Sequence, residues 1–420
     1  MPIRAPGRTR RGRARAAALA LAALLGAAVP GCGAPADPGA APTPVAATVR
    51  HSGGRDAEAA LQTAVRRLVA GGRAPGAAAL ALDGGGTRFA SAGLADVRTG
   101  RRIHESDRFR AGSITKTFVA AVVLQLAEQR RLDLDDTVDE HLPGLVRGES
   151  NDGRKITLRQ LLTHTSGLFD FAGDQRVARR LAGPPGASPL TPRQLVRIAV
   201  AHRPQFAPGA RWHYSNTNYV LLGLVVERVT GRPYAAETAR RVLTPLALRG
   251  TSFPGTRTTL PTPHGRAYAA QNGARRHHTP RDRAPGDRAP RDRTPHDRTP
   301  RDVTDLDPSP ASAAGEAIST LDDLARFYAA LLRGEVLGPA ALRRMRDTTA
   351  SDGRYGMGLF PVRLSCGVTL WGHNGRISGS YVQVVATPGG RHVLAYRLNS
   401  DVLPPSAAER DLLKAEFCRT

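Results

Sequence analysis

The hydrophobic pattern of this 420-residue chain changes period along its length, and this change limits the folds open to it. Near the N-terminal end, GAAALALD (76–83) and TRFASAGLAD (87–96) predict a β-hairpin around a glycine-rich turn. Near the C-terminal end, GVTLWGH, SYVQVVATP and RHVLAYRLNS predict three strands, which NG and PGG turns separate. Helical periodicity dominates between these groups. We therefore expect an α/β fold of the α+β type: an antiparallel sheet built from both termini, flanked by helices, with an inserted all-helical subdomain.

Several segments carry the spacing of apolar residues that is typical of helices. They are 57–70, 113–130, 156–168, 216–231, 319–334 and 405–418. Thr157 is a predicted N-cap, and Ser319 faces Asp322 three residues further on as a second start signal. Gly231 and Gly334 are the predicted stops.

The first 32 residues have the composition of an export signal. Six arginines fall within the first fifteen residues, and the apolar run AAALALAALLGAAV and the string PGCG follow. This order is typical of a signal peptide. VPGC resembles a lipoprotein cleavage box and predicts lipidation of Cys32; simple secretion after cleavage nearby and twin-arginine export through Arg10-Arg11 are the alternatives. Residues 33–55, rich in Ala, Pro and Gly, would then tether the folded body to the outer face of the cell membrane.

Export would place Cys366 and Cys418 in an oxidising compartment, where a disulfide persists. We expect this disulfide to tie the strand region near residue 366 to the C-terminal helix. Two buried free thiols are the alternative.

The formal net charge of +24 raises the question of nucleic-acid binding. The leader supplies six of these charges, and residues 273–302 add nine arginines against five aspartates. The remaining basic residues are interleaved with acidic ones, without a zinc-finger, basic-zipper or RNA-recognition signature. The pattern argues against a nucleic-acid-binding protein and favours attraction to an anionic envelope surface and to carboxylate ligands.

Residues 279–303 contain five copies of a five-residue unit: TPRDR, APGDR, APRDR, TPHDR and TPRDV. A proline at every fifth position prevents a regular helix or a central strand. No apolar residue larger than alanine occurs before Val303, so the segment has nothing to bury. We expect residues 273–303 to form a disordered surface insertion, without a metal site at its histidines.

A lysine stands three residues after Ser113 in AGSITKTF, although only three of the 60 basic residues are lysines. Positions i and i+3 share one face of a helix, so the Ser113 hydroxyl and the Lys116 amine would point into one space. A buried lysine can lose its proton and act as a base, whereas arginine stays charged. Ser113 is therefore a candidate nucleophile and Lys116 its base, at a helix N-terminus whose N–H groups can stabilise an oxyanion.

Two further motifs offer groups for acyl transfer. RWHYSNTNY places Tyr214 two residues before Asn216; the tyrosine can pass a proton to a leaving group, and the asparagine can bind a substrate amide. LWGHNGRISGSY places His373 and Gly375 at the end of a predicted strand, where glycine permits close approach of a ligand. Taken singly, these motifs also fit a helix cap beside a packing tyrosine and a tight hairpin turn.

The order and spacing of the three motifs resemble those of the penicillin-recognising serine hydrolases. Within that group the match is to the D-alanyl-D-alanine carboxypeptidase and class C β-lactamase-like family. The phrases FRAGSITKTF, LLTHTSGL, PGARWHYSNTNYVLLG and GHNG carry it. The resemblance covers residues 58–420 apart from the repeat insertion, and it implies that residues 56–420 form a serine hydrolase catalytic domain.

The resemblance implies a role for each matching residue. Ser113 would form the acyl-enzyme with Lys116 as its base, and Tyr214 would relay the proton to and from the leaving group. Asn216 would bind the acyl-side amide of the substrate. No cofactor and no metal are implied, and β-lactams would act as inhibitors or substrates.

The segment around His373 would form a substrate-binding edge. His373 stands where class C β-lactamases carry lysine, Gly375 completes the motif, and the backbone N–H groups of Ser113 and Arg376 would form the oxyanion hole. The sequence departs from the carboxypeptidases at Asn374 and Arg376, where threonine and a hydroxyl residue are usual. Two explanations stay open: the Arg376 guanidinium replaces the hydroxyl interaction with a terminal carboxylate by a charged one, or the substrate lacks a carboxylate.

The expected function is that of an exported serine acyl-hydrolase with D-alanyl-D-alanine carboxypeptidase activity on peptidoglycan peptides. A β-lactamase-like esterase or β-lactam hydrolase would use the same residues. A non-catalytic penicillin-binding cell-wall sensor is the alternative of another class. A Ser-His-Asp hydrolase is disfavoured because the sequence lacks a G-x-S-x-G motif.

Overall fold

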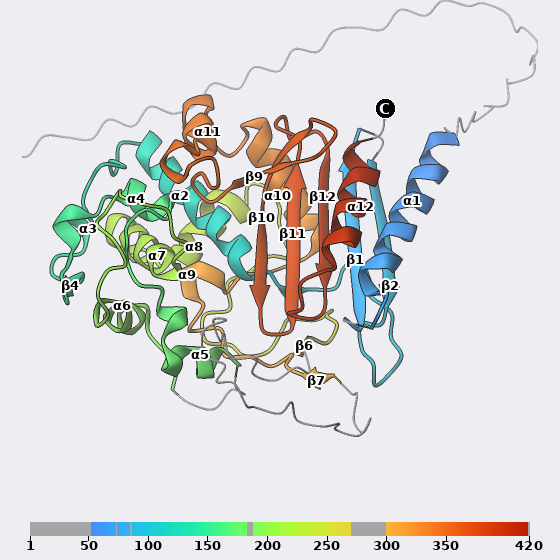
Figure 1. Ribbon diagram of the computed structural model, residues 1–420, viewed down its shortest axis with the longest axis horizontal. Coiled ribbons are helices and arrows are strands. Elements are labelled where there is room, and N and C mark those ends of the chain that lie inside the picture. Colours follow the sequence, from blue (N-terminus) through green and yellow to red (C-terminus); the bar gives the residue numbers. More distant parts are fainter. Residues whose placement is uncertain (1–51, 73, 85, 183–187, 270–299, 419–420) are drawn as a thin grey trace, which may run out of the picture. The chain divides into compact units, whose positions relative to one another are not determined.

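A six-stranded antiparallel sheet joins the two ends of the chain in the computed structural model (Figure 1). Across the sheet, its strands are β2 (Gly86–Gly93), β1 (Gly76–Asp83), β12 (Val393–Leu398), β11 (Ser380–Ala386), β10 (Thr369–Ile377) and β9 (Phe360–Arg363). Ala77 of β1 lies opposite Leu398 of β12, so the N-terminal hairpin pairs directly with the C-terminal strands. The predicted antiparallel sheet built from both termini is therefore confirmed.

The described residues are 52–72, 74–84, 86–182, 188–269 and 300–418, and all of them belong to the unit Arg50–Thr420. The predicted signal peptide, Cys32, most of the predicted tether and residues 273–299 of the predicted insertion lie outside them. The last residues of the predicted insertion are ordered, because β7 (Arg301–Asp302) pairs with β6 (Tyr268–Ala269). None of the described helices is long and apolar enough to cross a membrane.

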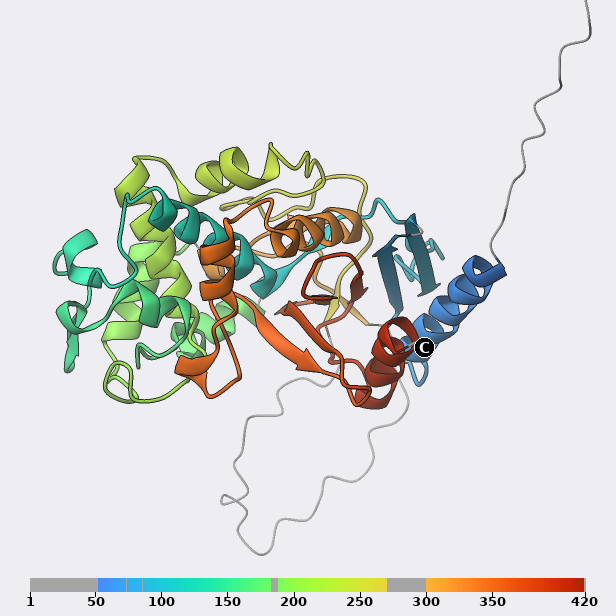
Figure 2. The ribbon, with the colours of Figure 1, turned by 90° about the horizontal axis from the view of Figure 1, so that it is seen from above.

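Helices cover both faces of the sheet (Figure 2). The helices α1 (Ser52–Val69) and α12 (Ser406–Phe417) pack together on one face, and α10 (Leu321–Arg333) lies on the other. Strand β1 contributes to both layers: Ala77 and Ala79 belong to the core under α1 and α12, whereas Ala78 and Leu80 belong to the larger core under α10. Burial on both faces explains why β1 reads as a continuous apolar run.

The region between β2 and β9 is mainly helical. Besides α10, its helices are α2 (Thr115–Glu128), α3 (Val138–His141), α4 (Leu158–Leu162), α5 (Gln175–Ala182), α6 (Pro192–Val200), α7 (Asn216–Thr230), α8 (Tyr234–Thr238), α9 (Ser312–Gly315) and α11 (Pro339–Arg346). It also contains three short ladders among the described residues: β3 (Phe109–Arg110) with β8 (Ile318–Ser319), β4 (Arg147–Gly148) with β5 (Asn151–Asp152), and the pair of β6 with β7 given above. The inserted subdomain is therefore not purely helical, because short backbone pairings join segments between the helices.

Most helix ends follow the predicted signals. The Thr157 hydroxyl accepts a backbone hydrogen bond at the start of α4, and Gly231 ends α7 with φ 70°. The N-cap predicted at Ser319 is wrong: Thr320 caps α10 by accepting from the Asp323 N–H, whereas Ser319 belongs to β8. An N-cap requires extended backbone directly before the helix, and Thr320 occupies that position.

The turn predicted at Asn374-Gly375 is also wrong, because both residues lie inside β10. The chain turns later, at Ser378 and Gly379, before it enters β11. Gly375 serves a close approach instead: a Cβ at this position would lie 1.9 Å from the backbone oxygen of Ala111. The glycine thus brings β10 against the segment that carries Ser113.

The C-terminal helix is tied to the sheet by a disulfide and by a buried ion-pair cluster. Cys366 and Cys418, which are 52 residues apart, form the predicted disulfide. Glu416, two residues before Cys418, has a side chain that is only 2% exposed. Its carboxylate accepts hydrogen bonds from the Arg88 guanidinium at 2.5 Å and from the His392 imidazole at 2.7 Å.

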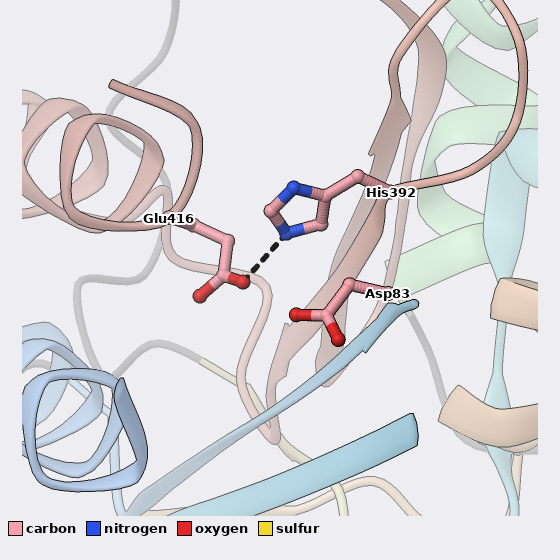
Figure 3. Close-up of side chains that lie close together, drawn as sticks. All are labelled: Asp83, His392 and Glu416. Atoms are coloured by element: carbon pink, nitrogen blue, oxygen red, sulfur yellow. Dashed lines mark hydrogen bonds and ion pairs between the residues drawn. The ribbon is translucent and has the colours of Figure 1, made fainter. Parts of the chain in front are cut away.

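Asp83 completes this cluster from the end of β1, because its carboxylate also pairs with Arg88, at 2.7 Å. Figure 3 shows His392 and Glu416 joined by a hydrogen bond, with Asp83 beside them. Potential ligand atoms of Asp83, His392 and Glu416 lie within 4.8 Å of one another, a spacing that a metal ion could use. However, the Arg88 guanidinium already bridges both carboxylates. The cluster is therefore best understood as an ion-pair network that fixes α12.

Candidate active site

Ser113 lies in a short 3-10 turn, η1 (Gly112–Ile114), that leads into α2. Gly112 has φ 53°, and a Cβ there would lie 2.8 Å from the backbone nitrogen of Arg376, so this position requires glycine. The Thr115 hydroxyl stabilises the turn by donating to the Gly112 oxygen at 2.7 Å. The α-helix begins at Thr115 rather than at Ser113 as predicted, and the serine is held at its N-terminal end.

Lys116 is fully buried in α2, and its ammonium nitrogen contacts three uncharged oxygen atoms. The Nζ atom lies 3.1 Å from Ser113 Oγ, 2.8 Å from Asn216 Oδ1 and 2.6 Å from the Ala314 carbonyl oxygen. Burial lowers the pKa of Lys116 to about 7, and the nearby charge of Asp170 opposes this effect only in part. Lys116 can therefore be uncharged near neutral pH and accept the Ser113 proton.

Tyr214 reaches the same space from the segment before α7, and Lys116 Nζ lies 4.8 Å from the centre of its ring. Burial raises the pKa of Tyr214, although an interaction with the Ser113 hydroxyl acts in the opposite direction. The phenol therefore stays protonated at neutral pH. In this form it can donate a hydrogen bond and a proton to a leaving group.

Asp170, which no sequence motif identified, fixes the orientation of the Asn216 amide. Asn216 Nδ2 donates to both carboxylate oxygens of Asp170, at 3.2 and 3.0 Å, and the Asn216 backbone N–H donates to the same carboxylate at 3.2 Å. With both donors engaged, the Asn216 oxygen faces Lys116. Asp170 itself is held as the N-cap of the 3-10 turn η3 (Phe171–Gly173).

The edge of β10 lies directly against η1. A Cβ at Gly375 would lie 3.1 Å from the Ser113 nitrogen, and a Cβ at Gly112 would lie 2.8 Å from the Arg376 nitrogen. The two backbone N–H groups predicted to form the oxyanion hole therefore belong to segments in close contact. Paired backbone N–H groups in this setting stabilise the negative charge of a tetrahedral intermediate.

A cavity of about 530 Å³ opens beside Ser113, a size that suits a small-molecule or peptide substrate. Its lining combines reactive groups with apolar surface and includes Ser113, Tyr214, Asn216, Phe171, Trp212 and Ile377. Of the described residues that line it, Arg376 alone carries a formal charge. The cavity thus offers an apolar wall and one cationic group.

His373 lies behind the cavity lining. The side chain is 1% exposed, with Nε2 at 2.9 Å from the Tyr355 hydroxyl and Nδ1 at 2.5 Å from the Asn374 carbonyl oxygen. Burial lowers the pKa of His373 to about 3, so the imidazole is neutral. His373 is not among the described residues that line the cavity, and its predicted contact with a substrate stays a prediction.

A serine acyl-hydrolase uses a serine together with a group that takes its proton, a proton donor and backbone N–H groups. The site holds these in Ser113, the buried Lys116, the protonated Tyr214 and two neighbouring backbone N–H groups. The family model described as Beta-lactamase matches residues 61–419. The chain belongs to the beta-lactamase family. The solved structure of a D-stereospecific amidohydrolase from Streptomyces sp. is 43% identical, with a TM-score of 0.72 over 86% of this chain and 99% of that chain. The protein is therefore a serine hydrolase with the β-lactamase fold.

Two further proteins that resemble this chain carry names of different activities. A D-amino acid amidase from Ochrobactrum anthropi SV3 is 26% identical, with a TM-score of 0.70 over 86% of this chain and 98% of that chain. Esterase EstB from Burkholderia gladioli is 40% identical over 168 residues, which are 38% of this chain and 42% of that protein. The chain thus spans about two fifths of the length of the curated relatives it matches.

The sequence motifs predicted no role for several residues of the site: Asp170, His164, Trp212, Phe171 and Tyr355. The phrases LLTHTSGL and RWHYSNTNY, which carry the family resemblance, contain His164 and Trp212, and Asp170 follows the first phrase closely. These phrases therefore marked the segments that contain these residues, but they did not predict a chemical role for any of them. Tyr355, which holds His373, lies in no such phrase.

Proposed function

We propose that this protein is a D-stereospecific serine peptidase that cleaves the amide bond before a carboxylate-bearing D-residue, as in peptides that end in D-alanyl-D-alanine. Arg376 carries the proposal, since it is the charged residue in the described lining of the cavity beside Ser113. A guanidinium binds a carboxylate through charge-assisted hydrogen bonds. The preference for D-configured substrates is supported by the likeness to the D-stereospecific amidohydrolase.

In the acylation step, uncharged Lys116 takes the proton of Ser113 while Oγ forms a bond to the substrate carbonyl carbon. The backbone N–H groups of Ser113 and Arg376 stabilise the oxyanion. The carbon–nitrogen bond then breaks, and the Tyr214 hydroxyl donates a proton to the leaving amine. Lys116 restores the proton of Tyr214, which leaves a neutral ester between Ser113 and the acyl group.

Deacylation reverses these proton movements with water in place of the amine. Tyr214, with Lys116, takes a proton from the attacking water, and the oxygen of Ser113 leaves with a proton. The Asn216 oxygen, which Asp170 and Lys116 hold in place, accepts a hydrogen bond from the acyl-side amide N–H of the substrate. The complete step consumes water and releases the acid, without a cofactor.

The test compares the purified protein with two arginine variants on acylated peptides that end in D-Ala-D-Ala or D-Ala-L-Ala. We expect kcat/KM to favour the D,D peptide by at least ~10²-fold. Arg376→Gln should lower kcat/KM for the D,D peptide by ~10–100-fold, through loss of a charged hydrogen bond. Arg363→Gln, at an exposed position on the adjacent strand β9, is the control. Equal rates on both peptides, or no effect of Arg376→Gln, would contradict the proposal.

A second candidate is hydrolysis of D-amino acid amides, whose leaving group carries no carboxylate. The 43% identity with the D-stereospecific amidohydrolase and the apolar cavity wall of Phe171 and Trp212 favour it. D-phenylalanine amide is the discriminating substrate. If it is cleaved faster than the D,D peptide, and Arg376→Gln leaves that rate unchanged, the amidase role replaces the peptidase role.

We also propose that the protein is exported and anchored through Cys32, on the strength of its arginine-rich leader and VPGC string. The disulfide between Cys366 and Cys418 supports an oxidising compartment. Labelling of expressing cells with a tagged fatty acid should mark the wild-type protein and not Cys32→Ser. Label on both variants, or on neither, would contradict lipidation at Cys32.

A further inference from the structure

We propose that His164 is a positioning residue for Tyr214: its backbone carbonyl and its imidazole fix the backbone on the two sides of the tyrosine, and the imidazole also supports the tyrosine ring. This inference rests on the proposed function, in which Tyr214 carries a proton to the leaving group. His164 is completely buried two residues after the end of α4, and it contacts Ser215, directly before α7, and Asn218, inside α7. It therefore connects two elements that meet at the site.

The backbone of Tyr214 is held by His164 from both neighbouring residues. The His213 N–H donates to the His164 carbonyl oxygen at 3.0 Å, and the Ser215 N–H donates to His164 Nδ1 at 3.2 Å. Tyr214 lies between these two hydrogen bonds in the chain. One residue thus supplies two acceptors that together fix the direction of the tyrosine backbone.

The ring of Tyr214 is supported by the same imidazole. The two ring centres are 4.2 Å apart and the ring planes are tilted by 34°, so the imidazole and the phenol ring are in direct contact. Tyr219 and Tyr355 confine the imidazole in turn, with ring centres at 5.2 and 4.8 Å. Since Lys116 Nζ also lies 4.8 Å from the Tyr214 ring centre, a shift of this ring would change the distance between the proton donor and the base.

The hydrogen bonds also determine where His164 carries its proton. Nδ1 accepts from Ser215 and from Asn218 Nδ2, at 3.1 Å, while the Asn218 oxygen accepts from the Ser166 hydroxyl at 2.6 Å. The proton of the neutral ring is therefore on Nε2. Burial and the charge of Lys116 hold the pKa of His164 well below its usual value. The imidazole stays neutral and does not compete with Lys116 as the base.

The backbone of His164 has φ 60°, a left-handed conformation that few residues with side chains adopt. Asparagine tolerates this conformation and offers an amide oxygen near the place of Nδ1, whereas leucine offers neither. These two substitutions separate the hydrogen bond from the ring. They also give a variant that folds if His164→Leu does not.

The experiment is a double-mutant cycle on the rate of acylation of the full chain by a fluorescent penicillin. Its variants are His164→Leu, His164→Asn, Tyr214→Phe and the two double variants. If His164 acts through Tyr214, His164→Leu lowers the rate by ~10–100-fold in the wild-type background, because a displaced catalytic group loses its alignment. In the Tyr214→Phe background the same change should cost less than ~2-fold. His164→Asn should restore part of the rate.

His213→Gln is the matched control, because its side chain is exposed beside Tyr214. The inference is overturned if the losses from His164→Leu and Tyr214→Phe multiply, or if the His164 variants lose rate only in proportion to melting temperature. Failure of the proposed peptidase function looks different, because it shows as equal rates on the D,D and D,L peptides and leaves the double-mutant cycle on acylation intact. If the penicillin does not acylate the wild type, crystal structures of wild type and His164→Asn decide the matter: an unmoved Tyr214 ring contradicts a positioning role.

Discussion

Lys116 and Glu416 are two of the charged residues that this protein buries, and their surroundings differ in one respect. Lys116 contacts a hydroxyl, an amide oxygen and a backbone carbonyl, all uncharged. Glu416, under the other face of the sheet, contacts the side chains of Arg88 and His392. Burial lowers the pKa of Lys116 to about 7. Burial alone would raise the pKa of Glu416, but its two partners lower it overall.

This difference shows that burial of a charged side chain has two outcomes in the same fold, depending on its partners. Where a buried charge has a partner of opposite sign, it stays ionised and links elements of the structure. Where a buried charge has no partner of opposite sign, burial favours the uncharged form of the group, and the group becomes reactive. At Lys116 the nearest carboxylate, Asp170, is occupied with Asn216 instead of the ammonium group.

The largest effect is expected from replacing Lys116, which has no ion-pair partner among the described residues, by arginine, which is always charged. Lys116→Arg should lower the acylation rate by at least ~10³-fold, because guanidinium cannot accept the Ser113 proton. Lys155→Arg and Lys414→Arg, both exposed, are matched controls that should stay within ~2-fold. Labelling with a fluorescent penicillin measures all three. An active Lys116→Arg enzyme would show that this residue is not the base.

Substitutions around the C-terminal helix α12, where Glu416 has charged partners, are expected to lower stability and not the rate of catalysis. Replacing both Cys366 and Cys418 by serine should lower the free energy of unfolding by about 4 kcal/mol, since the disulfide closes a loop of 52 residues. Denaturant unfolding with and without reductant measures this loss. Activity at 25 °C should remain. A variant with unchanged stability would mean that the bond contributes little to α12.

A smaller loss is expected when the charge of Glu416 is removed. Glu416→Gln should destabilise the protein by about 2 kcal/mol, because Arg88 and His392 lose their buried partner. Glu335→Gln, whose ion pair with Arg333 is exposed, should cost less than ~0.5 kcal/mol. Since the folded pKa of Glu416 lies below its usual 4.5, its contribution is complete above that pH and is lost as the pH falls through the folded pKa. A difference between wild type and Glu416→Gln that does not shrink in acid would contradict this account.

The smallest effect concerns the carboxylate near Lys116. In the wild type, acylation should increase as the pH rises through about 7, because the uncharged amine is the base. Asp170→Asn removes a charge that raises the lysine pKa, so the acid limb should move to lower pH. Rates normalised to the plateau give the shift. A limb that stays in place or moves upward would show that Asp170 does not influence Lys116.

The sequence was most informative where one local rule decided the outcome. Apolar runs bounded by turn signals located β1, β11 and β12, and the spacing from Ser113 to Lys116 was enough to place both groups together. The prediction of a turn at Asn374-Gly375 was wrong because glycine serves both tight turns and close backbone approaches. Only the position of Ala111 in the structure shows that the second applies here. Asp170 and Glu416 were not identified, since their partners come from distant segments that no local pattern relates.

The pairing of β1 with β12 also governs when this enzyme can become active. Ala77 must wait for Leu398, 321 positions later (398 − 77), before the central strands can pair. A ribosome adds roughly 5–20 residues per second, so the first hairpin waits for tens of seconds with one edge open. Arg376, whose N–H group is proposed to complete the oxyanion hole, emerges within the same final stretch. The proposed nucleophile Ser113 is thus synthesised early and the rest of the proposed site late, so a nascent chain has no complete site to expose to acyl donors until its synthesis is almost finished.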